Sequence, residues 1–148
     1  MWTRTTEDRL LLWREQREQI STLNKAEAIA EATKYWCQAP IASQYLSADL
    51  IKDWPDPWEL LQDNCYDDIS ITLMTVFTLV FARTDCDEFK IKMLVDESGE
   101  EFHTAWFADG KYIINYEYGD VVSSDKLPSN MRLKYEYNFT DLKINNYK

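Results

Sequence analysis

The segment from Ile69 to Ala82 constrains the fold of this chain more than any other. It is the longest apolar stretch in the sequence, interrupted only by serine and threonine. Its β-branched residues would permit a strand, but its length and its lack of turn residues favour a helix. Because apolar side chains occur on nearly every face, that helix must be buried. We predict a central helix over Ile69–Phe81, shorter than the roughly 20 residues that span a bilayer.

Two helices are expected before this segment. The first begins after Thr5, whose hydroxyl can accept a hydrogen bond from the amide of Asp8 and so cap the helix. The second begins after Asn24, with Glu27 three residues later to complete a capping box. It ends before Pro40, because proline cannot continue a helix. The sequence therefore predicts two short antiparallel helices.

A rigid corner separates these helices from the central one. In the run Trp54-Pro55-Asp56-Pro57-Trp58, each proline fixes its own φ and restricts the residue before it. Pro57 also suits the first position of a helix, so we expect a further short helix from there to Asp63.

The hydrophobic period changes after this helical region to the two-residue period of a strand. Asp109-Gly110 is a strong signal for a hairpin turn, and Ser98-Gly99 marks another turn. The expected strands are Phe89–Val95, Glu101–Phe107, Lys111–Tyr118 and Arg132–Phe139. Consecutive strands joined by short turns predict an antiparallel sheet of about four strands.

The predicted fold class is therefore α+β, with N-terminal helices packed on a C-terminal antiparallel sheet. A chain of 148 residues has the usual size of one domain. No repeat, low-complexity tract or linker divides it. We expect a single domain over residues 1–148, with a helical half at 1–83 and a sheet half at 84–148.

The charge of the chain excludes several classes of partner. Asp and Glu number 26 against 16 Lys and Arg, which gives a formal net charge of −10. Nucleic acids and anionic membranes are recognised by clustered basic residues, so neither is expected as a partner. The densest basic group, Arg14 and Arg17, lies among Glu15 and Glu18 and predicts ion pairs along an exposed helix face.

Bound cofactors and metal ions are not expected either. With three glycines, the chain has no glycine-rich phosphate loop. The acidic run Asp85–Glu88 surrounds Cys86 but has no second cluster of ligands, so we expect a solvated loop there. Three cysteines, an odd number, and the absence of a signal peptide indicate a reducing cytoplasm.

Cys65 is the first candidate for chemistry. It stands where a short turn gives way to the central helix, and a thiol at a helix N-terminus is stabilised as thiolate by the helix dipole and by unpaired amides. His103, the only histidine, follows on a strand, with Asn115 or Asp109 on the neighbouring strand. A cysteine nucleophile, a histidine base and an orienting amide or carboxylate are the parts of a cysteine-dependent acyl-transfer site.

The register of the hairpin bears on whether these residues meet. If Asp109-Gly110 is a two-residue turn, His103 faces Tyr116 and Asn115 lies on the opposite side of the sheet. If the loop has three residues, Ala108–Gly110, then His103 lies directly across from Asn115. Both loops suit the sequence, so both arrangements remain open.

A plainer interpretation competes with the catalytic one. A cysteine beside a mostly apolar helix is usually a small core residue, and a single histidine on a strand is usually only hydrogen-bonded. The neighbouring carboxylates of Asp67 and Asp68 would also oppose formation of a thiolate.

The segment from residue 63 to residue 116 resembles the transglutaminase-like and papain-like cysteine enzymes. In these enzymes a cysteine opens a buried helix with an acidic residue two positions on, and a histidine begins a strand that turns into the strand carrying the third member. Asn64-Cys65-Tyr66-Asp67, His103-Thr104-Ala105-Trp106 and the stretch from Asp109 to Asn115 look like this pattern. The usual glycine before the cysteine is absent, and Asn115 stands one residue earlier than the expected aspartate. The resemblance implies a related scaffold with an incomplete catalytic pattern.

A second resemblance spans nearly the whole chain. Met1–Arg9, Trp54–Leu61, and Ile113–Tyr116 followed by Gly119-Asp120-Val121 look like small conserved proteins of cyanophages with contractile tails. This resemblance implies a phage protein in the host cytoplasm or in the virion, whose partners are other phage proteins or further copies of itself.

Two functions follow from these observations. The favoured hypothesis is a non-enzymatic structural or virion-assembly protein that acts through protein–protein contacts. The alternative is an active thiol hydrolase or acyltransferase that uses Cys65, His103 and Asn115. Aromatic residues in excess of what a small core holds often lie at interfaces. The candidates for such contacts are Trp2, Tyr45, Trp54 and Trp58.

Overall fold

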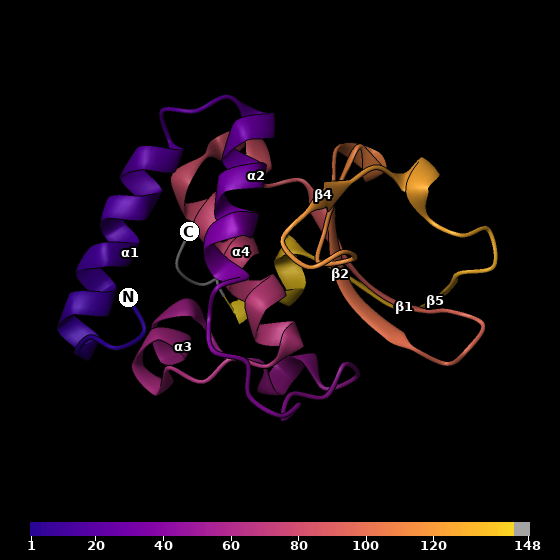
Figure 1. Ribbon diagram of the computed structural model, residues 1–148, viewed down its shortest axis with the longest axis horizontal. Helices are drawn as coiled ribbons and strands as arrows, with labels where there is room; N and C mark the ends of the chain where they lie inside the picture. The colour runs from indigo at the N-terminus through magenta and orange to yellow at the C-terminus, as the bar shows by residue number, and fades with distance from the viewer. Residues whose placement is uncertain (144–148) are drawn as a thin grey trace.

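The central helix predicted from the sequence is α4, Asp68–Ala82, in a computed structural model that describes residues 1–143. Every residue from Ile69 to Val80 in α4 is buried. Three helices pack against it, α1 (Thr6–Ile20), α2 (Lys25–Trp36) and α3 (Pro57–Asp63), and strand β2 (Glu101–Phe107) of the sheet contacts it from the other side (Figure 1). The helix is buried because the rest of the chain is arranged around it.

The three other α-helices are α1, Thr6–Ile20, α2, Lys25–Trp36, and α3, Pro57–Asp63. Their predicted starts are confirmed. The Thr5 side chain accepts a hydrogen bond from Asp8 N at the start of α1. A capping box of Asn24 and Glu27 begins α2, and Pro57 is the first residue of α3. No helix in the described part of the chain is long and apolar enough to cross a membrane.

A threonine of α4 joins three helices by hydrogen bonds. The indole Nε1 of Trp13 in α1 and that of Trp36 in α2 each donate to Thr78 Oγ1 at 2.9 Å. The Thr78 hydroxyl itself donates to the carbonyl of Met74. Both indole donors are thereby satisfied in the core, where an unpaired N–H would be costly.

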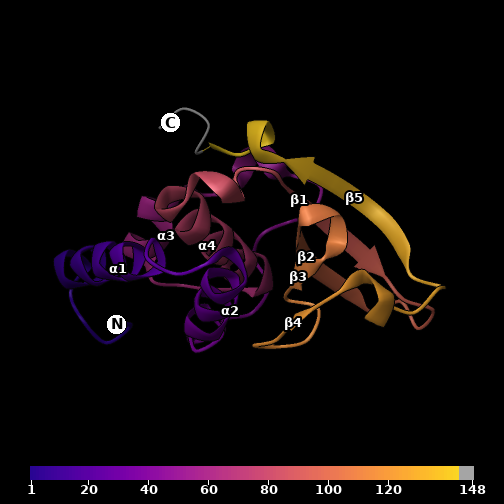
Figure 2. The ribbon, with the colours of Figure 1, turned by 90° about the horizontal axis from the view of Figure 1, so that it is seen from above.

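The sheet is antiparallel and follows the helices in the chain, so the predicted fold class is confirmed. It has five strands in the order β4-β3-β2-β1-β5, one more than expected. Figure 2 shows the α-helices gathered beside one end of the sheet. The strands are β1, Phe89–Val95, β2, Glu101–Phe107, β3, Tyr112–Ile114, β4, Val121–Val122, and β5, Arg132–Asn138.

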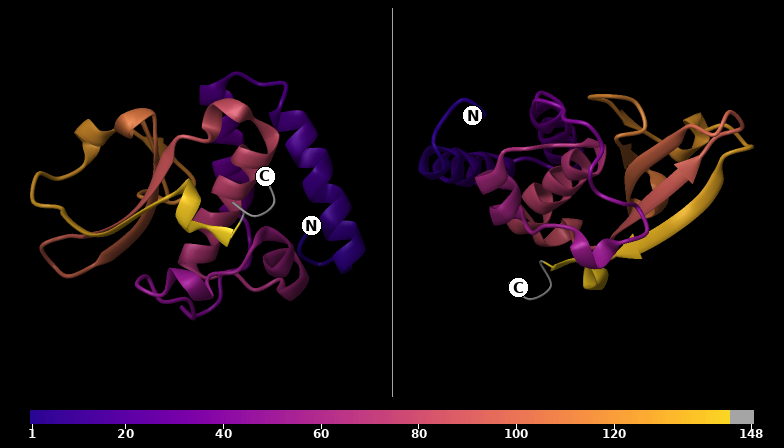
Figure 3. Two further views of the ribbon diagram at one scale, coloured as in Figure 1. Left: turned by 180° about the vertical axis from the view of Figure 1, so that it is seen from behind. Right: turned by 90° about the horizontal axis from the view of Figure 1, so that it is seen from below.

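Short 3₁₀ turns and one long connection complete the fold. The connection between α2 and α3 passes beside α4 to the sheet (Figure 3), where Tyr137 Oη donates to the carbonyl of Ala48 at 2.7 Å. It therefore brings residues 44–54 alongside β5. The 3₁₀ turns are η1, Ile51–Asp53, η2, Thr84–Cys86, η3, Ala108–Gly110, η4, Ser124–Lys126, and η5, Phe139–Asp141.

The hairpin between β2 and β3 has the register of the two-residue alternative but a longer loop. Phe107 pairs with Tyr112 and Ala105 with Ile114, so four residues, 108–111, connect the strands. The strand predicted over Lys111–Tyr118 ends at Ile114, because Asn115 has a positive φ of 61° and leaves the strand conformation.

The loop at residues 85–88 differs from the solvated loop that the sequence predicts. The Cys86 side chain is buried, and Asp85 accepts from both Nε and Nη2 of Arg83. Burial raises the pKa of the Cys86 thiol to about 11. The cysteine behaves as a small core residue, and the charged residues before and after it face outward.

The aromatic residues proposed for interfaces divide into two groups. Trp54 is only 2% exposed, donates from Nε1 to the Ser47 carbonyl and packs on Tyr137, so its assignment to a contact surface was wrong. Trp2 is partly buried against Tyr35 and Trp36. Tyr45 and Trp58 are exposed, at 49% and 38%. Only this last pair presents substantial aromatic surface.

Candidate functional site

Cys65 lies before the central helix rather than at its first turn. The helix begins at Asp68, and its N-cap is Asp67, whose side chain accepts from Ser70 N. Cys65 is exposed, and among residues 1–143 its thiol makes no hydrogen bond to His103. The prediction that Cys65 occupies the helix N-terminus was therefore wrong, and the amides of the first turn serve Asp67 instead.

The backbone around Cys65 explains why its side chain points outward. Asn64 is the C-cap of α3 in the left-handed conformation, with φ 51°, and its side-chain amide donates to the Trp2 carbonyl. Tyr66 is fully buried and forms a parallel β-bridge with Ile41, and burial raises the pKa of its phenol. Since successive side chains of an extended segment point to opposite sides, an inward Tyr66 leaves Cys65 facing solvent.

Asp67 is a structural carboxylate. It is completely buried, and besides the cap it accepts from the backbone amides of Tyr45 and Leu46 at 3.0 and 2.8 Å and from Gln44 Nε2 at 3.0 Å. These bonds fasten the segment at residues 44–46 to the start of α4. A buried carboxylate is tolerated only with such a set of donors.

His103 contacts a different residue of the same helix terminus. Its Nδ1 lies 2.7 Å from Asp68 Oδ2, and the residue is 7% exposed. Because a carboxylate accepts, Nδ1 carries a proton in this pair. The other ring nitrogen, Nε2, lies 3.8 Å from Glu101 Oε2. Lys134 Nζ is 2.7 Å from Glu101 Oε1, and this hydrogen bond lowers the pKa of the Glu101 carboxyl.

Asn115 reaches the site although the strand register does not place it there. On a regular strand in this register its side chain would point away from His103, because Ile114 faces the core. The left-handed backbone at Asn115 turns the amide back, so that Nδ2 lies 3.1 Å from Asp68 Oδ1 and 2.7 Å from Thr72 Oγ1. The side chain of Asn115 therefore does not stay on the opposite side of the sheet, where this register would place it, and it reaches the backbone of His103.

The contact between Asn115 and His103 is not the one that a catalytic triad requires. Asn115 Nδ2 is 3.2 Å from the His103 carbonyl, and Thr72 Oγ1 donates to the same carbonyl at 2.5 Å. No hydrogen bond in the described structure joins Asn115 to the imidazole ring. Asn115 therefore positions Asp68, and Asp68 in turn holds the ring.

A cavity of about 290 Å³ opens beside Glu101, His103 and Lys134. Its remaining wall comes from Gln44, residues 46–49 and Tyr135, and Asp67 holds Gln44 and Leu46 of this segment. Within residues 1–143, no group of three or more His, Cys, Asp or Glu side chains is arranged to hold a metal ion. Three of the ionisable side chains that line the cavity, Glu101, His103 and Lys134, already pair with one another.

The catalytic alternative drawn from the sequence named His103 and Asn115, but it did not place Asp68, Thr72 or Glu101 beside them. Glu101 was within reach of such reasoning, because residues two apart on a strand share a face. Asp68 and Thr72 are four apart on α4 and also share a face. Their alignment with His103 depends on how the helix packs on the sheet, which no local pattern encodes.

Comparisons with known proteins agree with this fold. No protein-family model matches the sequence, and no curated protein matches it. Solved structures of Legionella pneumophila LapG are similar, with a TM-score of 0.74 for the calcium-bound form and 0.73 for the EGTA-treated form. Both are 14% identical in sequence; the matches cover 91% and 90% of this chain and 77% and 74% of LapG.

LapG has the transglutaminase-like, papain-like cysteine-protease fold, so the present chain shares that fold. The resemblance inferred for residues 63–116 is confirmed at the level of the scaffold. No comparison supports the resemblance to cyanophage proteins.

Proposed function

We propose that this chain is a non-enzymatic protein that uses a transglutaminase-like scaffold to bind other proteins. The observation that carries the proposal is the exposed position of Cys65 before α4, with no hydrogen bond in the described structure from its thiol to either ring nitrogen of His103. A general base for a cysteine must have a free ring nitrogen within hydrogen-bond reach of the thiol. Here Asp68 holds Nδ1, as an orienting carboxylate would, but Nε2 faces Glu101 at 3.8 Å and not the thiol of Cys65.

The electrostatics of the helix terminus support the same conclusion. The positive end of α4 meets the carboxylates of Asp67, its N-cap, and Asp68, its first residue. Cys65 lies two residues before the N-cap, so its thiol is not at the helix terminus, where a nucleophilic cysteine is activated.

Alkylation of Cys65 by iodoacetamide, followed by peptide mass spectrometry, tests the proposal. The rate should rise with pH along the same curve in the wild type and in His103→Gln, with folding of both checked by circular dichroism. The Cys37 thiol of the same molecule is an internal control for reagent and pH. Rapid alkylation of Cys65 near pH 6 that His103→Gln abolishes would overturn a non-enzymatic role.

A cysteine-dependent hydrolase or acyltransferase with Cys65, His103 and Asn115 is the second candidate. The scaffold shared with LapG favours it, and so does the Asp68 side chain, which is 42% exposed and not locked in the core. If Asp68 alone silences the site, Asp68→Ala should accelerate both alkylation of Cys65 and its acetylation by p-nitrophenyl acetate at least tenfold, in a manner that needs His103. Unchanged rates in Asp68→Ala would exclude this second function.

The biological setting of the proposed binding function rests on sequence resemblance. Residues 1–9 and 54–61 look like proteins of contractile-tailed cyanophages, and a virion or assembly role in the infected host cell is the corresponding proposal. Mass spectrometry of purified virions of a phage that encodes this chain tests it. Absence of the chain from both virions and assembly intermediates would refute that role.

A further inference from the structure

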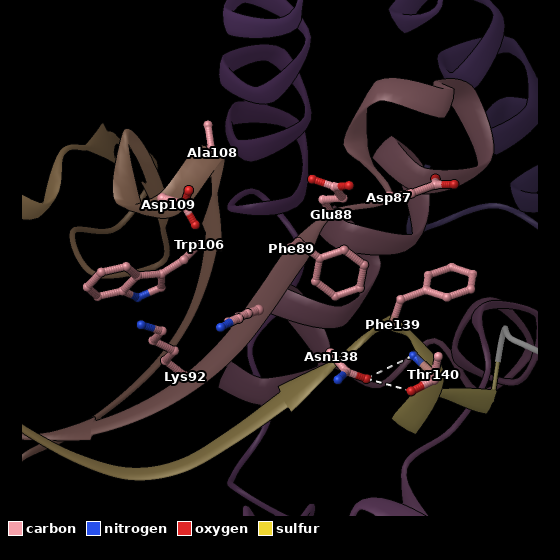
Figure 4. Close-up of a pocket in the computed structure, with 11 residues that line it drawn as sticks. Asp87, Glu88, Phe89, Lys92, Trp106, Ala108, Asp109, Asn138, Phe139 and Thr140 are labelled. Carbon is pink, nitrogen blue, oxygen red and sulfur yellow. Dashed lines mark hydrogen bonds between the residues drawn. The ribbon is translucent and has the colours of Figure 1, made fainter.

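A second cavity, of about 460 Å³, lies away from the His103 site. It is formed where the start of β1 and the end of β2 meet the turns η3 and η5. Figure 4 shows Phe89 and Phe139 close together on one side of it and the Trp106 indole on the other. The volume is ample for one large side chain together with part of its backbone.

The walls of this cavity are fixed by contacts within the sheet. The Phe89 ring packs on Phe107 and Phe139 at centroid distances of 5.9 and 6.3 Å. The Trp106 indole donates from Nε1 to Thr104 Oγ1 at 2.9 Å, and Lys92 Nζ lies 4.0 Å from the indole ring centroid. Because these contacts fix the positions of the rings, an occupant has little ordering cost to overcome.

The charges at the cavity are uneven. Glu88 and Asp109 contribute carboxylates to its lining. Two lysines also line it, but both Lys90 and Lys92 have their ammonium groups 3.7 Å from Glu136, which partly neutralises them. The surroundings therefore carry an excess of negative charge, on a chain whose net charge is −10.

We propose that this cavity binds a segment of a partner protein that presents one large apolar side chain next to lysine or arginine. The apolar side chain would lie between Phe89 and Trp106, and the flanking cations would face Glu88 and Asp109. The inference deepens the proposed binding function by naming a surface and a class of partner. It rests on that function, but the two fail separately, because the cavity involves neither Cys65 nor His103.

Titration of the ¹⁵N-labelled full chain with acetyl-Lys-Phe-Lys-amide, followed by NMR, tests the proposal. Saturable shifts of the Trp106 indole N–H are expected. Acetyl-Lys-Ala-Lys-amide should bind about tenfold more weakly, because the ring is the buried part. Acetyl-Glu-Phe-Glu-amide should also bind more weakly, since its charges meet the carboxylates.

Variants of the carboxylates that line the cavity separate recognition of charge from non-specific apolar binding. Glu88→Lys combined with Asp109→Asn should weaken binding of the Lys-Phe-Lys peptide about three- to tenfold. Asparagine tolerates the left-handed backbone at position 109, where φ is 54°, so the fold should be retained. Glu97→Gln, an exposed change at the far end of β1, is the control and should leave binding unchanged.

Three results would overturn the proposal. The first is equal binding of the Lys-Phe-Lys and Glu-Phe-Glu peptides, and the second is the absence of saturable shifts at Trp106. The third is a dependence of the Trp106 signal on protein concentration without peptide, which would identify a second copy of this chain as the occupant. Normal slow alkylation of Cys65 in the same sample would leave the non-enzymatic role standing in each case.

Discussion

Replacement of Asp67 by asparagine should destabilise the protein far more than the same change at Asp68. The Asp67 carboxylate is fully buried and accepts from two backbone amides of the segment at 44–46, as well as from Ser70 N and Ser70 Oγ. An amide of the same shape keeps only one oxygen as an acceptor. Its NH₂ group would then face the N–H donors that the other oxygen now satisfies.

The cost can be worked out from these contacts. The remaining amide oxygen can keep the N-cap bond, since asparagine caps as well as aspartate does, so the loss falls on the bonds from the Tyr45 and Leu46 amides, each worth about 1.5–3 kcal/mol to a charged acceptor. Because neighbouring losses are not additive, we expect Asp67→Asn to lower the free energy of unfolding by about 3–4 kcal/mol. Asp68→Asn removes the same charge from a side chain that is 42% exposed, and should cost less than about 1 kcal/mol.

Urea unfolding followed by far-UV circular dichroism measures both changes. If Asp67 fastens the 44–46 segment, the Asp67→Asn variant should also expose that segment to limited proteolysis under native conditions. A loss below 1 kcal/mol for Asp67→Asn, or an equal loss for Asp68→Asn, would refute the assignment of Asp67 as the residue that orders the helix terminus.

Further changes give distinct outcomes. Trp54→Ala should lower the free energy of unfolding by about 3–5 kcal/mol because the side chain is buried, whereas Trp58→Ala at an exposed position should lower it by about 1 kcal/mol. Urea unfolding measures both values, and equal values would contradict the difference in burial. Gly110→Ala should lower the melting temperature by several degrees, because φ is +92° and a Cβ would lie 3.0 Å from the Trp106 ring; an unchanged melting temperature would show that the loop can relax. Burial raises the pKa of the Cys86 thiol to about 11, so this thiol ionises at lower pH in the unfolded chain than in the folded one. The stability that it contributes is complete below about pH 8.5 and is lost as pH rises toward 11. Unfolding measured at several pH values should show a smaller loss of stability above about pH 8.5 in Cys86→Ala, and the same pH dependence in both proteins would contradict this prediction.

The fold was largely predictable because its signals are local. The caps at Thr5 and Asn24, the first-turn proline Pro57 and the long apolar segment of α4 each depend on residues within a few positions of one another. Alternating side chains likewise predicted β1 and β2. The two-residue strand β4 was missed, because so short a segment has no period to detect.

The candidate site was predictable only in part. One of the two hairpin registers left open by the sequence placed Asn115 across from His103; the structure has the other register, and Asn115 reaches the His103 carbonyl through its left-handed backbone. Under the catalytic alternative Cys65 would face the imidazole, but Asp68 does so instead. Cys65 and Asp68 are only three positions apart in the sequence.

By itself the sequence determined an α+β chain with a buried central helix, capped helices before it and an antiparallel sheet after it, since periodicity and capping act between near neighbours. The tertiary structure alone decided which residue meets the imidazole. Bonds from Asp67 to a segment more than 20 positions earlier set where α4 begins, and the buried Tyr66 turns Cys65 toward solvent. Contacts between residues so far apart in the chain leave no mark in a local pattern, and here they give the place beside His103 to a carboxylate.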